Sequence, residues 1–140
     1  NYYTLKIGEN EMYKAAQQNA LGDLYFERGD FESAEIAFRY ASNINPYELP
    51  YLENYANAKL QLGKFDEAIE AYQSSISLKP GYYELYFNIG NALKDQGKFS
   101  EAIEYYKKSI SIKPDYVDAF FNMGNVFQHL EKQDEAIKIY

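Results

Sequence analysis

The chain has 140 residues, of which 46% are hydrophobic and 25% are charged, and its formal net charge is −7. This acidic balance argues against nucleic acid and against an anionic membrane surface as partners, because both would repel the chain. There is no cysteine, which excludes disulfides, thiolate metal sites and a cysteine nucleophile. No apolar run approaches the ~20 residues that cross a bilayer and no signal sequence is visible, so a cytoplasmic protein is expected.

The lead-in segment, residues 1–14, does not share the pattern of the remaining chain. Its Asn10 is a candidate N-cap for the first helix, because its side chain can accept a hydrogen bond from a free backbone N–H. From residue 15 onward the sequence repeats every 34 residues, and prolines close the first three repeats at Pro46, Pro80 and Pro114. The boundaries are repeat 1 at 15–48, repeat 2 at 49–82, repeat 3 at 83–116 and an incomplete repeat 4 at 117–140. We expect the chain to be a fragment of a longer array.

Each repeat is predicted to be a pair of helices joined by a tight turn. In repeat 3, the segments 83–96 and 98–112 both place apolar residues at the i, i+3, i+4, i+7 spacing of an amphipathic helix. A glycine separates the two helices in each complete repeat, namely Gly29, Gly63 and Gly97. Glycine tolerates the positive φ that ends a helix, and the proline then stops the second helix.

Small residues recur in two further columns, at Gly22, Ala56, Gly90 and Gly124 on the first helix and at Ala34, Ala68, Ala102 and Ala136 on the second. A glycine inside a helix costs about 1 kcal/mol relative to alanine, so its recurrence indicates that close packing offsets the loss. Many aromatic residues fall in columns that we expect to be buried, such as Tyr25, Phe38, Tyr72, Tyr86, Tyr106, Phe120 and Phe127. The predicted fold class is therefore all-α.

These motifs resemble the signature of the tetratricopeptide repeat family. The residues that carry the resemblance are LG or IG, then a tyrosine or leucine, GDF or GKF, EAI, an aromatic residue and the closing proline. The resemblance implies a right-handed superhelical solenoid of antiparallel helix pairs, with a concave groove that binds an extended polypeptide. The segment NIGNALKDQGKF is also similar to the superhelical arrays of protein O-glycosyltransferases and their bacterial relatives.

Two columns of asparagine lie on the face of the first helices opposite the buried stripe. The first ladder consists of Asn54, Asn88 and Asn122, and the second of Asn57, Asn91 and Asn125. Asparagine is a poor helix former, so its recurrence needs another reason. An amide can pair with the backbone of an extended peptide, and the resemblance implies this role for the first ladder. The alternative is that the amides, those of the second ladder above all, bond to the neighbouring repeat and hold the stack in register.

The remaining candidate contacts surround the ladders: Asp23, Glu53, Glu84 and Asp118 are acidic, while Phe87 and Phe121 offer apolar contacts. An acidic groove favours a neutral or basic peptide. In the resembled family a clamp of lysine, asparagine and arginine holds the C-terminal carboxylate of chaperones, and the corresponding positions here are Glu53, Asn57, Asn88, Asp118 and Asn122. Every cation of that clamp is missing, so the sequence disfavours chaperone tails as ligands.

Catalysis and cofactors are not indicated by the sequence. The single histidine, His129, has no cysteine and no convincing serine partner, and no phosphate-binding glycine loop occurs. We therefore predict a non-catalytic protein-interaction module that needs neither metal nor cofactor. The alternatives are a substrate-recruiting segment of a larger enzyme, such as a glycosyltransferase, and a self-assembling scaffold.

Repeat 4 departs from the pattern at its turn, where Glu131 stands in the glycine column and Gln133 replaces an aromatic residue. A non-glycine residue with positive φ costs roughly 1 kcal/mol, so we expect this repeat to be the weakest. The sequence ends before a following helix could cover its apolar residues, which are Met123, Phe127, Leu130, Ile137 and Tyr140. We therefore expect self-association through the C-terminal repeat.

Overall fold

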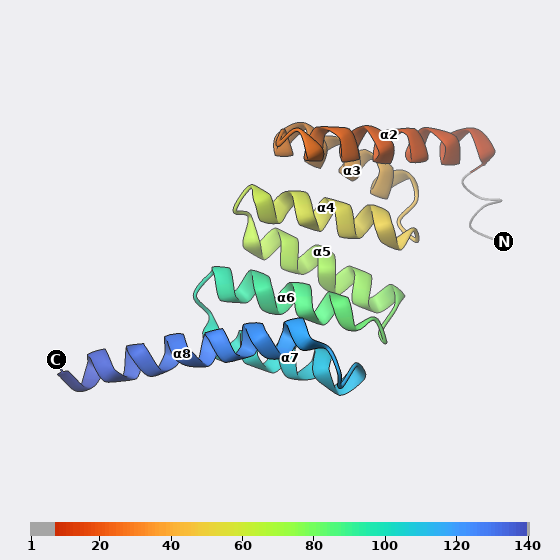
Figure 1. Cartoon of the computed structure of the whole chain (residues 1–140). Helices are drawn as coiled ribbons and strands as arrows, with labels where there is room; N and C mark the ends of the chain where they lie inside the picture. The colour runs from red at the N-terminus through yellow and green to blue at the C-terminus, as the bar shows by residue number, and fades with distance from the viewer. Residues whose placement is uncertain (1–7, 140) are drawn as a thin grey trace. The chain divides into compact units, whose positions relative to one another are not determined.

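The structure, a computed structural model, describes residues 8–139, and every regular element in this part of the chain is an α-helix (Figure 1). The chain divides into two compact units, with the boundary after Pro80. Unit 1 contains repeats 1 and 2, and unit 2 contains repeats 3 and 4. The predicted all-α array of helix pairs is confirmed, while the right-handed superhelix remains a prediction.

Unit 1 consists of α2 (Glu9–Glu27), α3 (Phe31–Ile44), α4 (Leu49–Gln61) and α5 (Phe65–Leu78). Each helix packs on the next one along the chain, and the two first helices, α2 and α4, also touch. Helix α2 begins directly after Gly8, whose φ is 82°. The expectation that Asn10 caps this helix is therefore wrong, because Asn10 lies inside the first turn.

Unit 2 consists of α6 (Tyr83–Asp95), α7 (Phe99–Ile112) and α8 (Val117–Ile139). Helix α8 runs through the place where a turn was expected, as its unbroken ribbon in Figure 1 shows. The expectation of positive φ at Glu131 is wrong, since no non-glycine residue in the described range has a positive φ. Glutamate is a good helix former and is strained in the left-handed region, so continuing the helix costs less locally than breaking it.

The turns inside repeats 1 to 3 form at the predicted glycines. Gly29, Gly63 and Gly97 have φ values of 79°, 74° and 79°. No atom lies within 4 Å of the place where a Cβ would stand at these three positions. Backbone conformation, and not crowding, is therefore the reason that glycine is needed here.

The glycines inside the first helices have the opposite reason, which is close packing. A Cβ on Gly22 would lie 2.5 Å from the ring of Phe38, and a Cβ on Gly90 would lie 2.7 Å from the ring of Tyr106. Both rings are fully buried, together with Tyr72 of repeat 2. The predicted role of these glycines as spacers is confirmed.

Repeat 4 does not bury the residues that the pattern assigned to its core. Phe120 is 47% exposed and Phe127 is 48% exposed, whereas Leu93 in the Phe127 column of repeat 3 is 4% exposed. Gly124 is exposed, with no atom within 4 Å of its Cβ position. The reason is that α8 continues straight and does not fold back over this face. The side chains of Ile137 and Tyr140, expected on the same surface, lie outside the described part.

Within residues 8–139, no helix combines the length and the apolar character needed to span a bilayer.

Candidate functional site

The asparagine side chains in unit 1 bond to other residues of the unit. The amide of Asn54 on α4 donates from Nδ2 to Oδ1 of Asn19 on α2, over 2.9 Å. Oδ1 of Asn57 accepts a hydrogen bond from the hydroxyl of Tyr72 on α5. Both asparagines are half-buried. One amide therefore joins two repeats, and the other joins the two helices of repeat 2.

In unit 2 the two ladders meet at a single oxygen. Oδ1 of Asn91 on α6 accepts from the hydroxyl of Tyr106 at 2.6 Å and from Nδ2 of Asn122 on α8 at 2.8 Å. Asn88, one turn before Asn91, is half-buried, and its side chain forms no hydrogen bond with another described residue. Asn125 is half-buried and lines a cavity described below. The second ladder thus contributes to internal bonding at Asn57 and Asn91.

These bonds involve the hydroxyl groups of two buried tyrosines, and the pKa of each hydroxyl is raised. Burial raises the pKa of Tyr72, and the charge of Glu53 raises it further. Burial also raises the pKa of Tyr106, where a hydrogen bond with Asn122 acts in the opposite direction and the charge of Asp95 adds to the rise. Both hydroxyls therefore stay protonated in ordinary conditions and act as fixed donors to the asparagines.

The acidic candidates occupy different surroundings. Partial desolvation raises the pKa of Asp23, and the neighbouring charge of Glu27 adds to this rise. Glu84 is half-buried, and its Oε2 accepts a hydrogen bond from the hydroxyl of Tyr82 at 2.8 Å. Asp118 is exposed at the start of α8; burial, followed by the charge of Asp118, raises the pKa of Tyr116 to about 12.

The two aromatic candidates also differ. The ring of Phe87 packs against Tyr106 and Tyr116, with ring centroids 5.9 Å and 4.9 Å away, so it contributes to the packing of unit 2. Phe121 is 68% exposed on α8. Of these two rings, Phe121 offers the larger free surface to a partner.

A cavity of about 370 Å³ lies in unit 2, between the C-terminal end of α6, the first residue of α7 and the middle of α8. Its wall includes Lys94, Asn125, Gln128, His129 and Lys132. The imidazole of His129 stacks on the ring of Phe99 with the planes 2° apart and the centroids separated by 5.3 Å. These residues were not recognised from the sequence as one group. Comparing columns would have found it, because Lys94 stands where repeat 1 has Phe26.

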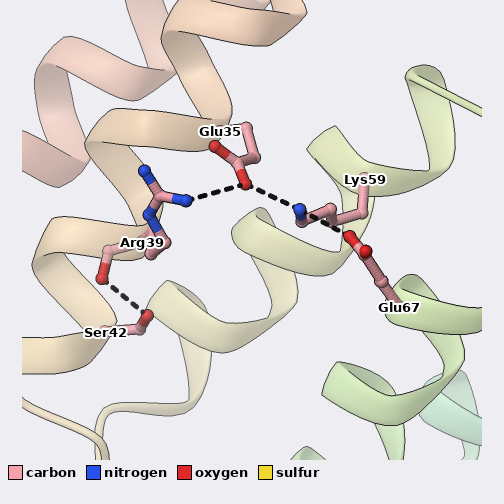
Figure 2. Close-up of polar contacts among 5 residues, drawn as sticks. All are labelled: Glu35, Arg39, Ser42, Lys59 and Glu67. Carbon is pink, nitrogen blue, oxygen red and sulfur yellow. Dashed lines mark hydrogen bonds and ion pairs between the residues drawn. The ribbon is translucent and has the colours of Figure 1, made fainter. Parts of the chain in front are cut away.

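A second feature missed by the sequence analysis is a buried ion-pair network in unit 1 (Figure 2). Nζ of Lys59 on α4 lies 2.7 Å from Oε1 of Glu35 on α3 and 2.6 Å from Oε2 of Glu67 on α5. Nη1 of Arg39 lies 3.6 Å from the same Glu35 oxygen. The side chains of Lys59 and Glu35 are each 7% exposed. A cleft of about 570 Å³ opens beside them and is lined in part by Tyr55.

The charge balance of this network explains how a lysine can be buried. Burial alone lowers the pKa of Lys59, but the hydrogen bonds to Glu35 and Glu67 outweigh it, so the pKa lies above its usual range. Hydrogen bonding to Lys59 lowers the pKa of Glu67. The signal in the sequence is again a column change: Glu35 replaces the isoleucine of repeats 2 and 3, and Lys59 replaces Leu93 of repeat 3.

Among the described residues, no group of three or more histidine, cysteine, aspartate or glutamate side chains could hold a metal ion.

Family comparison identifies the kind of protein that these repeats form. The family model described as TPR repeat matches residues 56–97 and 90–131, and the model described as Tetratricopeptide repeat matches residues 18–48. The chain therefore belongs to the tetratricopeptide repeat family, as its motifs predicted. No curated protein is similar enough to the chain to count as a match.

Solved structures with the same fold include several tetratricopeptide repeat domains. The first TPR domain of human RPAP3 has a TM-score of 0.79 at 22% identity, covering 89% of this chain and 98% of that chain. The first TPR of Spaghetti (RPAP3), bound to the HSP90 peptide SRMEEVD, has a TM-score of 0.77 at 24% identity, covering 85% and 94%. The crystal structure of MamA has a TM-score of 0.77 at 26% identity, covering 89% and 72%.

Proposed function

We propose that the chain is a protein-interaction module that binds an extended polypeptide along its first helices, with asparagine amides as contacts to the peptide backbone. The observation that carries this proposal is that the asparagines of the first ladder keep amide groups free of internal hydrogen bonds. Asn54 donates one N–H to Asn19, which leaves its amide oxygen and its second N–H. Asn122 donates to Asn91 and to Tyr106, which leaves its amide oxygen. The side chain of Asn88 forms no hydrogen bond with another described residue. The N–H and C=O groups of an extended peptide backbone can pair with the oxygen and the N–H groups of these amides.

Structures of the same fold support a peptide as the ligand. One neighbour is a TPR bound to an HSP90 peptide, and another is the second TPR domain of human RPAP3 in complex with the HSP70 peptide SGPTIEEVD, at 21% identity and a TM-score of 0.76. We infer that this chain accepts a peptide as well. The chain departs from the chaperone clamp in the positions named above, so the partner is expected to differ from a chaperone tail.

Charge on the first helices of unit 1 favours a neutral or basic peptide there. Asp23 lies on α2, one turn after the Asn19 that bonds to Asn54, and Glu53 precedes Asn54 on α4. Burial raises the pKa of Asp23, and the negative charge of Glu27 raises it further. A basic side chain of the ligand would relieve that repulsion. The remaining candidate contacts, Glu84, Asp118 and Phe121, belong to unit 2 and extend the same proposal.

The test uses Asn88, because it can be removed without breaking an internal bond. A peptide ligand is first selected from a random display library with the 140-residue chain as bait. Asn88→Ala should then weaken binding of that peptide by about 0.5–1.5 kcal/mol and leave the melting temperature unchanged. Asn43→Ala, on the exposed surface of α3, is the control and should change neither quantity. A loss of stability with unchanged affinity would assign the amide to the fold.

A second proposal concerns self-association through repeat 4. Four apolar side chains of α8 are largely exposed to solvent, with exposed fractions of 73% for Val117, 68% for Phe121, 48% for Phe127 and 47% for Phe120. Apolar side chains gathered along one helix favour association with a second copy of the chain. This scaffold role is compatible with peptide binding, as is recruitment of substrate for a larger enzyme. The module itself is proposed to be non-catalytic and cytoplasmic, without a cofactor.

A further inference from the structure

We infer that the cleft beside the ion-pair network of unit 1 binds a long basic side chain, lysine or arginine, of a protein partner. The cleft is lined by residues of α3, α4 and α5 and has a volume of about 570 Å³. This volume lies within the range of ~300–1,000 Å³ that is usual for ligand sites. The site is separate from the asparagine ladders, so it goes beyond the proposed function.

The cleft and the asparagine ladders occupy different faces of α4. The side chains of α4 that line the cleft are Leu52, Tyr55 and Lys59. At 100° per residue they lie roughly 100–160° around the helix from Asn54, whereas Asn57 lies roughly 60° from Asn54 in the opposite direction. A partner can therefore occupy the cleft without displacing a peptide from the ladders.

The ionised side chains around the cleft leave one carboxylate uncompensated. In the network of Figure 2 two cations face two carboxylates, so these four charges cancel. The fifth charge, Glu70, lines the cleft from the exposed surface of α5. Its carboxylate forms no ion pair or hydrogen bond with another described residue. The cleft therefore carries one net negative charge, which attracts a ligand cation.

Repeat 3 shows what the carboxylate of Glu70 lacks. Its counterpart one repeat later, Glu104, pairs with Lys107 at 3.8 Å. Gln73 stands in the Lys107 column of repeat 2, so the lysine that neutralises Glu104 has no equivalent beside Glu70. A lysine or arginine of a protein partner would supply the missing cation.

Two other departures from the repeat make room for a ligand. Ala71 lines the cleft where repeat 3 has Tyr105. Ser42 lines it where repeats 2 and 3 have Ile76 and Ile110. Both positions hold a small side chain in place of a large one. The space therefore results from the side chains of repeats 1 and 2 and not from the backbone of the repeat.

The remaining lining suits both parts of a basic side chain. Apolar surface for the alkyl stem comes from Pro46, Leu52, Tyr55 and Ala71. The hydroxyl of Ser74, one turn after Glu70, donates to the backbone oxygen of Glu70 at 3.1 Å, so its lone pairs remain to accept hydrogen bonds. This oxygen and the Glu70 carboxylate can both accept from an ammonium or guanidinium group.

The experiment titrates the isotope-labelled 140-residue chain with small probes and follows its backbone amide signals by NMR. N-acetyl-lysine methylamide and N-acetyl-arginine methylamide carry the two candidate side chains. N-acetyl-norleucine methylamide keeps an alkyl stem without the charge, and N-acetyl-glutamate methylamide reverses the charge. At least one basic probe should shift the signals of Ala71 and Ser74 in a saturable manner at millimolar concentration, and the neutral and acidic probes should not.

Matched variants connect the signal to the cleft. Glu70→Gln should weaken binding of the active basic probe about threefold to fivefold, because it removes the charge and keeps the size of the side chain. Glu104→Gln makes the same change in repeat 3, outside the cleft, and should alter affinity by less than about twofold. Ser74→Lys places a lysine one turn after Glu70, where its ammonium can pair with the carboxylate and should weaken the probe more than fivefold.

The assignment is overturned if neither basic probe moves these signals, if the norleucine or glutamate probe moves them equally, or if Glu104→Gln is as damaging as Glu70→Gln. Tighter binding of 1,5-diaminopentane than of either basic probe would assign the cleft to free polyamines and would also overturn it. None of these results touches the proposed function, because Asn88→Ala tests a different surface with a different ligand.

Discussion

Replacing Lys59 by methionine is expected to destabilise unit 1 strongly, because it leaves the Glu35 carboxylate buried without its closest cation. Glu35 is 7% exposed and its distance from Nζ of Lys59 is 2.7 Å. Breaking a buried ion pair from one side costs about 3–5 kcal/mol. Arg39, 3.6 Å away and half-exposed, can recover part of this loss, so we expect a cost of about 2–4 kcal/mol.

The double variant Glu35→Ile with Lys59→Leu is expected to recover the stability. It places in repeats 1 and 2 the apolar residues that later repeats carry in the same columns. Replacing a buried ion pair by apolar residues of similar size is neutral or stabilising by about 1–4 kcal/mol. The single variants Glu35→Ile and Lys59→Leu and this double variant form a cycle whose coupling energy should exceed about 2 kcal/mol.

Urea unfolding followed by circular dichroism gives the overall stability, and native-state hydrogen exchange separates the two units, since repeat arrays need not unfold as one. Lys64→Met removes an exposed lysine from the same unit and is the control. Two results would contradict this prediction. One is that Lys59→Met loses no more free energy of unfolding than Lys64→Met, and the other is that the double variant is as unstable as Lys59→Met.

Three further predictions use the same structure. Gly90→Ala should destabilise by about 1–3 kcal/mol, because its Cβ would lie 2.7 Å from the buried Tyr106 ring, whereas Gly124→Ala should stabilise by about 0.5–1 kcal/mol; thermal melts giving equal signs would contradict this. The pKa of Glu67 is lowered from its ordinary 4.5, so its stabilising contribution is complete above that value and is lost as the pH falls through the lowered pKa. Glu67→Gln should flatten the acid limb of a stability–pH curve, and an unchanged limb would exclude this residue. The chain should self-associate at high micromolar concentration and Phe121→Glu should not, and sedimentation showing a monomeric parent chain would end that proposal.

Local features of the repeat could be predicted from the sequence because they depend on residues close together in the chain. The turns at Gly29, Gly63 and Gly97 require positive φ, which glycine alone adopts without strain. The contacts of Gly22 with Phe38 and of Gly90 with Tyr106 each lie between two helices that follow one another directly in the chain. Period and composition therefore determined the helix pair, its turn and its family.

The candidate site could be predicted only in part. The sequence placed asparagines on the exposed side of the first helices, but an amide can bond to a peptide or to its own protein equally well. In the structure Asn57 and Asn91 each accept a tyrosine hydroxyl, and Asn122 reaches across to Asn91. Those choices depend on where the next helix places its hydroxyl or amide, to within about an ångström, and periodicity carries no such information.

Three features were recognised only in the tertiary structure: the buried pair of Glu35 and Lys59, the donors around the α6–α8 cavity, and the unbroken course of α8 through Glu131. Each arises from a departure from the repeat, and a departure has no template elsewhere in the chain. A charge in an apolar column is stable only if its partner lies opposite it in three dimensions. A turn without glycine forms only if packing of the folded-back helix outweighs the strain. The sequence thus determined what the repeats share, and packing between helices determined where they differ.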